Sequence, residues 1–97
     1  MLYLSKLLSR DYVYDAVSLT TTLTLHGVRF QYVLNTRDIW LRDFMPVQTR
    51  TRRLVSFRYE PSYLAKFPKL RTDFRRDIAQ SFGCSVVYSD INLDGGN

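Results

Sequence analysis

Two aspartates flank the only tryptophan of the chain, in a short stretch between two expected strands. Asp38 stands two residues before Trp40, and Asp43 stands three residues after it. A carboxylate accepts two parallel N–H bonds from a guanidinium, and an aromatic ring stacks on that planar cation. The stretch is therefore a candidate guanidine site. The alternative, which composition alone favours, is that Trp40 belongs to the core and the aspartates pair with Arg37 and Arg42.

A second candidate is the run Asp94-Gly95-Gly96-Asn97. Paired glycines permit positive φ angles and close approach of the backbone to a ligand, and an aspartate before them can be directed into a cleft. The alternative is an ordinary turn, for which Asp-Gly is a common sequence.

Together the two motifs resemble the guanidine-modifying (pentein) superfamily, above all the agmatine deiminases and the bacterial peptidylarginine deiminases. The family segments read Trp-x-Arg-Asp-x-x-Pro and (Glu/Asp)-Gly-Gly-(Asn/Ser). Here the first reads Trp40-Leu41-Arg42-Asp43-Phe44-Met45-Pro46, with Asp38 two residues before the tryptophan, and the second is Asp94-Gly95-Gly96-Asn97. The resemblance covers residues 30–97.

The resemblance implies an α/β fold that forms part of a five-fold, pentein-like β/α propeller. The chain would be a single N-terminal fragment with about two of the five ββαβ-type units, at residues 1–45 and 46–97. A weak internal repeat fits this, because a helix, a glycine, a strand and an aspartate-bearing loop occur twice. Gly27 and Gly83 mark an offset of 56 residues, and chance similarity is the alternative.

The resemblance also assigns roles to residues. Asp43 would grip the substrate guanidinium as the catalytic acidic residue, Trp40 would pack on it, and Asp94 would form a second acidic wall. Arg58 is a further candidate, for a substrate carboxylate. The residues that support the motifs are Asp38, Arg42, Gly95, Gly96 and Asn97.

The family reaction hydrolyses a guanidine C–N bond and releases ammonia, and it needs a cysteine thiolate and a histidine. In the family both follow the Gly-Gly motif, so we expect this chain alone to be inactive. Cys84 and His26 are interpreted as structural, Cys84 as a small buried residue. The reaction requires no organic cofactor and no metal. The expected ligand is a guanidine-bearing small molecule or an arginine side chain.

Composition excludes several other kinds of site. Cys84 and His26 are the only cysteine and histidine, so no intramolecular disulfide, thiolate cluster or histidine-based metal site is expected. No apolar run reaches the roughly 18 residues of a membrane span, and residues 1–10 lack the pattern of a signal peptide. We therefore expect a cytoplasmic protein that does not contact a membrane.

Hydrophobic periodicity predicts the first elements. A helix is expected to begin after Ser9-Arg10-Asp11, which can cap it, and to end at Gly27. Its apolar residues are Tyr12, Ala16, Leu19 and Leu23. Strands are expected at 28–34, 46–49 and 54–59. Residues 50–53 are expected to form the hairpin turn between the last two strands.

The strongest helix signal lies in residues 68–82. Its apolar residues are spaced by four, and they are Leu70, Phe74, Ile78 and Phe82. Pro68 suits a first helical turn, and Gly83 is expected to end the helix. A strand is expected at 84–88.

The alternative function is a small basic module that binds nucleic acid or an acidic partner through the arginines of residues 50–58. The formal net charge is +5. No helix-turn-helix, zinc or single-strand-binding signature supports this, so nucleic acid is not the expected partner. For a fragment with unburied helix faces and sheet edges, self-association is expected.

Overall fold

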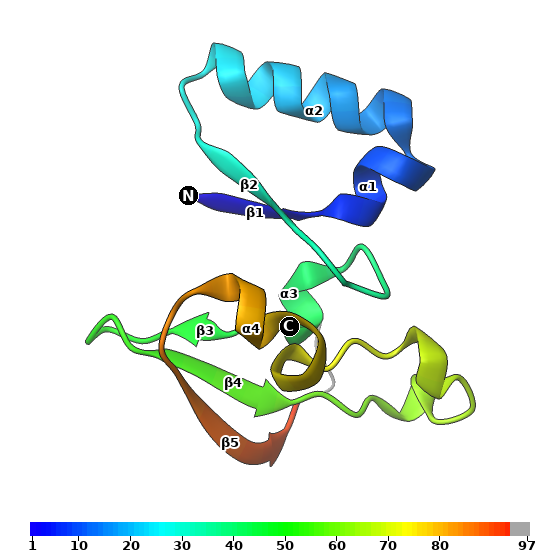
Figure 1. Ribbon diagram of the computed structural model, residues 1–97, viewed down its shortest axis with the longest axis vertical. Helices are drawn as coiled ribbons and strands as arrows, with labels where there is room; N and C mark the ends of the chain where they lie inside the picture. The colour runs from blue at the N-terminus through cyan, green and yellow to red at the C-terminus, as the bar shows by residue number, and fades with distance from the viewer. Residues whose placement is uncertain (94–97) are drawn as a thin grey trace.

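Two pairs of parallel strands organise the computed structural model, which describes residues 1–93 (Figure 1). In the first pair, β1 (Leu2–Ser5) lies beside β2 (Phe30–Val33). The connection between them runs through α1 (Lys6–Asp11) and α2 (Val13–Leu25). The helix and strand expected here are confirmed, and the α/β class with them.

The second pair belongs to a three-stranded sheet in the order β3-β4-β5. β3 (Val47–Gln48) and β4 (Leu54–Arg58) form the expected antiparallel hairpin, and β5 (Val86–Asn92) pairs in parallel with β4. β5 extends four residues past the predicted strand end at Tyr88. The second unit thus has the order strand, strand, helix, strand, whereas the first has the order strand, helix, strand.

The 56-residue offset also relates the starts of two strands. β2 begins at Phe30 and β5 begins at Val86. Before each strand a glycine adopts a left-handed conformation, with φ of 68° at Gly27 and 72° at Gly83. Glycine reaches this region without steric penalty, so both expected helix ends are confirmed.

An additional helix, α1, precedes the predicted one, which corresponds to α2 and begins at Val13. Ser5 caps α1: its hydroxyl accepts the N–H of Leu7 at 3.2 Å. Ser9, Arg10 and Asp11 form the last turn of α1, and the hydroxyl of Ser9 donates to the carbonyl of Lys6. The predicted cap at 9–11 was therefore wrong, because these residues belong to α1 and the N-cap residue of α2 is Tyr12, whose side chain makes no capping bond.

The predicted continuous helix over 68–82 was also wrong in its first half. A 3-10 turn, η2 (Pro68–Leu70), is followed by extended residues, then by the π-helical η3 (Phe74–Ile78) and by α4 (Ala79–Phe82). Asp73 caps η3 by accepting the N–H of Arg76. Helical structure starts again only at this cap, so Leu70 lies outside the apolar stripe and is 51% exposed.

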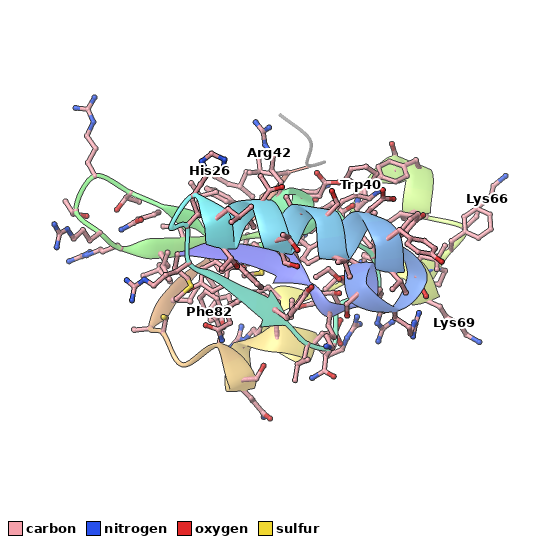
Figure 2. All side chains as sticks on the ribbon, turned by 90° about the horizontal axis from the view of Figure 1, so that it is seen from above. His26, Trp40, Arg42, Lys66, Lys69 and Phe82 are labelled. Carbon is pink, nitrogen blue, oxygen red and sulfur yellow. The ribbon has the colours of Figure 1, made fainter. Side chains whose placement is uncertain are left out.

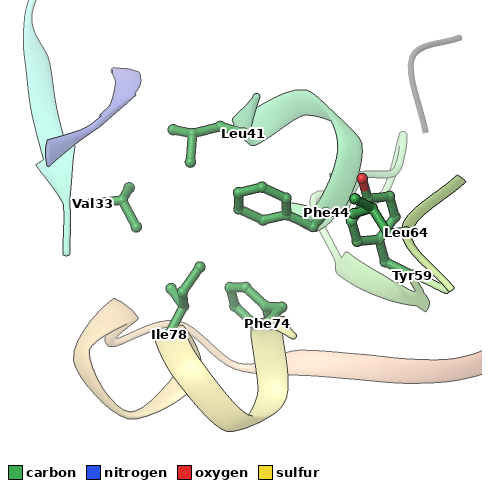
Figure 3. Packing of buried hydrophobic residues seen from close by; sticks show 7 residues of the cluster. All are labelled: Val33, Leu41, Phe44, Tyr59, Leu64, Phe74 and Ile78. Carbon is green, nitrogen blue, oxygen red and sulfur yellow. The ribbon is translucent and has the colours of Figure 1, made fainter. Parts of the chain in front are cut away.

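The core joins both units (Figure 3). It collects side chains from β2, the short helix α3 (Leu41–Phe44), the segment after β4, the 3-10 turn η1 (Ser62–Leu64) and η3. Its buried members are Val33, Leu41, Phe44, Tyr59, Leu64, Phe74 and Ile78.

α2 contributes almost nothing to this core. Ala16 is its only buried residue, and Tyr14, Val17 and Leu25 are 91%, 59% and 80% exposed. Self-association through such exposed apolar residues stays a prediction. Within residues 1–93 no helix is both long and apolar enough to cross a bilayer.

Buried hydroxyls hold the loop that leads from β2 to α3. Ser5 at the end of β1 shares a hydrogen bond with Thr36, and Thr72 accepts the backbone N–H of Arg37 at 2.9 Å. Ser5, Thr36 and Thr72 are 2%, 7% and 0% exposed. This hydroxyl clamp (Ser5, Thr36, Thr72) connects β1, the 34–40 loop and the extended segment before η3.

Thr72→Val tests the clamp, because it removes the hydroxyl and keeps the size of the side chain. The N–H of Arg37 would lose its acceptor, so the free energy of unfolding should fall by about 1–3 kcal/mol in urea denaturation. Thr21→Val, at an exposed position of α2, is the matched control and should change stability by less than about 0.5 kcal/mol. Equal stabilities of the two variants would contradict a role for the clamp.

Candidate functional site

The short helix α3 separates core side chains from site side chains. Leu41 and Phe44 lie one turn apart and are 9% and 4% exposed, so both anchor the helix in the core. Arg42 and Asp43 lie between them on the other sides of the turn, Arg42 exposed and Asp43 half-buried. Burial of two residues thus fixes the direction of the other two.

The turn before α3 places Asp38 beside Trp40. The backbone N–H of Trp40 donates to Oδ1 of Asp38 at 3.3 Å, a local side-chain turn typical of aspartate. The N–H of Asp43 donates to the carbonyl of Trp40 at 3.0 Å. Trp40 is 63% exposed, and Figure 2 shows Trp40 and Arg42 at the edge of the molecule opposite Phe82.

Neither aspartate is neutralised by a neighbouring arginine. Arg37 pairs with Asp77 at 3.5 Å instead of with Asp38. Within residues 1–93 no cationic side chain lies within 4.0 Å of Asp38 or Asp43. The alternative prediction was that Trp40 belongs to the core and that the aspartates pair with Arg37 and Arg42. It is wrong, because Trp40 is exposed and within residues 1–93 neither aspartate forms an ion pair.

Two tyrosines lie near the acid pair (Asp38 and Asp43). The hydroxyls of Tyr59 and Tyr63 lie 2.8 Å apart, and the ring of Tyr59 packs 5.9 Å from that of Phe44. Burial raises the pKa of Tyr59 above its ordinary value, as do the bond to Tyr63 and the negative charges of Asp43 and Asp38. Its hydroxyl thus stays protonated beside the carboxylates.

Sequence reasoning did not identify these tyrosines as site residues. Their spacing of four residues was visible, but Pro61 between them breaks any regular element. Only the η1 turn that follows Pro61 brings the two hydroxyls together.

Arg58 lies apart from the acid pair. It pairs with Glu60 at 3.6 Å and lines a hollow of about 150 Å³ together with Tyr88 and Asp90. Neither Asp38 nor Asp43 lines this hollow. The structure therefore does not bring Arg58 together with the predicted guanidine contacts.

The remaining sequence candidates lie outside the site or outside the described residues. Asp94, Gly95, Gly96 and Asn97 fall beyond residue 93, so the second acidic wall is not described. Cys84 is exposed, which corrects its interpretation as a buried residue. Within residues 1–93 no three His, Cys, Asp or Glu side chains form a group that could hold a metal.

Alkaline titration tests the coupling of Tyr59 to the acid pair. Because the pKa of Tyr59 is raised on folding, its contribution to stability is present below about pH 10 and is lost as the pH rises further. In phenolate absorbance at 295 nm, Tyr59→Phe should remove the latest-titrating step. Asp43→Asn should move that step to lower pH, whereas Asp15→Asn on α2 should leave it in place. An unchanged step in Asp43→Asn would contradict the coupling.

Comparison with known proteins adds no family assignment. No protein-family model matches the chain, and no curated protein or solved structure matches it either. The function must therefore be argued from the chemistry of the site.

Proposed function

We propose that this chain binds a guanidinium group at Asp38, Trp40 and Asp43, as one acidic wall of a deiminase-type active site. The observation that carries the proposal is the state of the two carboxylates. They are half-buried, they flank an exposed indole, and they have no cationic partner within residues 1–93 although Arg37 and Arg42 are their sequence neighbours. Unpaired carboxylates beside an aromatic face suit a planar cation from outside.

The guanidinium is expected to lie on the indole of Trp40 and to donate N–H bonds to the carboxylates. A hydrogen bond to a charged group contributes about 1.5–3 kcal/mol where water is partly excluded. The half-buried carboxylates provide that exclusion, and stacking on Trp40 adds about 0.5–1 kcal/mol at an exposed ring. A flexible ammonium cannot form the same parallel bonds, so the site should prefer guanidines to amines.

In the proposed reaction a cysteine thiolate attacks the guanidinium carbon, ammonia leaves, and water hydrolyses the covalent adduct to a ureido product and the free thiol. In this proposal the described residues bind the guanidinium group of the substrate. His26 and Cys84 make no hydrogen bond or ion pair with Asp38 or Asp43 in the described part of the chain. We therefore propose binding without turnover for these 97 residues.

The order of elements supports the finer proposal of a pentein-like propeller. The second unit runs β3, β4, helical segment, β5, which is the ββαβ order of such a unit. The first unit has the order of the last three of these elements, and in both units the two strands joined through helices pair in parallel. Each unit leaves apolar surface exposed, as expected where neighbouring units would pack.

Fluorescence of Trp40 tests the proposal, because it is the only tryptophan and lies in the site. Agmatine, arginine and N-acetylargininamide should change the emission saturably, and cadaverine, an ammonium of similar length, should not. Asp43→Asn should weaken guanidine binding by at least about tenfold, since a charge-assisted bond pair is lost. Asp15→Asn, at an exposed carboxylate on α2, should bind as the unmodified chain does.

Two outcomes would contradict the proposal. One is an equal response to cadaverine and agmatine, which would indicate nonspecific cation attraction. The other is unchanged guanidine affinity in Asp43→Asn. Arg58→Ala should leave the binding of agmatine and arginine unchanged, because Arg58 lines a separate hollow that neither Asp38 nor Asp43 lines.

A further inference from the structure

The positive charge of the chain is concentrated on the β3–β4 hairpin. Residues 44–59 contain four arginines and no acidic residue, so this stretch carries +4 of the net charge of +5. Three of the four, Arg50, Arg52 and Arg53, lie in or beside the loop and are exposed. Figure 1 shows the loop between β3 and β4 projecting beyond the sheet.

Within residues 1–93 these three arginines have no carboxylate partner. Arg10, Arg37, Arg58, Arg71 and Arg76 each pair with a carboxylate. In the described part of the chain no carboxylate lies within 4.0 Å of Arg50, Arg52 or Arg53. Their guanidinium groups remain available to an external anion.

Backbone groups and threonine hydroxyls hold the loop. The N–H of Thr49 donates to the carbonyl of Arg53 at 2.8 Å, and Thr49 Oγ1 accepts the N–H of Arg53 at 3.2 Å. The N–H of Arg52 donates to the carbonyl of Thr49 at 3.0 Å, and the hydroxyls of Thr49 and Thr51 lie 3.0 Å apart. The backbone and the threonines form the turn, which leaves the guanidiniums to project from it.

Arg52 occupies a conformation that glycine would adopt at lower cost. Its φ of 61° lies in the left-handed region, where glycine or asparagine is the usual residue of a turn. Local backbone strain of this kind concentrates at binding and switch positions.

We propose that this loop binds the phosphodiester backbone of a nucleic-acid duplex. The backbone of residues 50–53, which carries the three arginines, spans at most about 10 Å, and duplex DNA presents one charge per roughly 1.7 Å of its axis. Each arginine can therefore meet its own phosphate, with the bidentate geometry that guanidinium and phosphate share. The proposal is independent of guanidine binding at Asp38, Trp40 and Asp43.

The composition of the loop favours a duplex over other polyanions. Residues 49–53 are threonine and arginine only, so the loop has no aromatic ring to stack on the bases of a single strand and no apolar side chain to enter a bilayer. An acidic protein surface reaches a comparable charge density only where carboxylates cluster. This composition therefore favours the alternative function, a basic module that binds nucleic acid, with the loop as the part that contacts it.

The test measures binding of the 97-residue chain to a 20-base-pair DNA duplex by fluorescence anisotropy at several salt concentrations. Three phosphate contacts predict a slope of about −2.7 in log K against log salt, so affinity should fall about 40-fold between 50 and 200 mM. The triple variant R50A/R52A/R53A should lose both the affinity and this slope.

The control variant R29A/K66A/K69A removes three other exposed cations and also changes the net charge from +5 to +2. Figure 2 shows Lys66 and Lys69 at the opposite end of the molecule from the hairpin loop. This variant should keep most of the affinity and of the slope, and far-UV circular dichroism of both variants should match the unmodified chain.

Three results would overturn the proposal. The first is no duplex binding at 20 mM salt, and the second is an equal loss in the two triple variants, which would assign binding to net charge alone. The third is equal or tighter binding of single-stranded DNA, polyglutamate or phosphatidylserine vesicles, each of which would assign the loop to another class of polyanion.

Discussion

The hydroxyl clamp is the constraint on which the rest of the site depends. Thr72 and the Ser5–Thr36 pair are buried, so these groups have no solvent to replace a lost partner. Buried polar groups of this kind specify one arrangement, because any other leaves a donor or acceptor unsatisfied. The clamp ties β1 and the segment before η3 to the loop that ends at Trp40. The orientation of the tryptophan and the two aspartates therefore follows from contacts far away in sequence.

The hydroxyl clamp also determines which arginine pairs with which aspartate. With its N–H held by Thr72, Arg37 lies where its side chain reaches Asp77 instead of Asp38. The hydrogen bonds from Arg76 lower the pKa of Asp77 and outweigh its burial, which acts to raise it, and Arg37 lowers it further. The carboxylate of Asp77 thus pairs with two arginines. Within residues 1–93 Asp38 therefore has no cationic partner, so its negative charge is not compensated by a neighbouring side chain.

The sequence predicted the parts of the fold that depend on local pattern. Helical spacing, the glycine stops at Gly27 and Gly83 and the arginine-rich hairpin turn are all visible within a few residues of chain. The break before η3 was not predictable, because it depends on Thr72 meeting Arg37 across 35 positions. The same holds for the candidate site: its residue types were recognisable, but tertiary contacts alone decide that Trp40 is exposed and that the aspartates are unpaired.

The most direct measurement is carboxylate carbon NMR of the chain during titration with agmatine. The account predicts that the signals of Asp38 and Asp43 shift together and saturate at one concentration of ligand. Signals of Glu60 and Asp90, which line the separate hollow at Arg58, should stay in place. Shifts at Glu60 and Asp90 with none at Asp38 and Asp43 would contradict the account, because they would assign the guanidine to the hollow instead of to the acid pair beside Trp40.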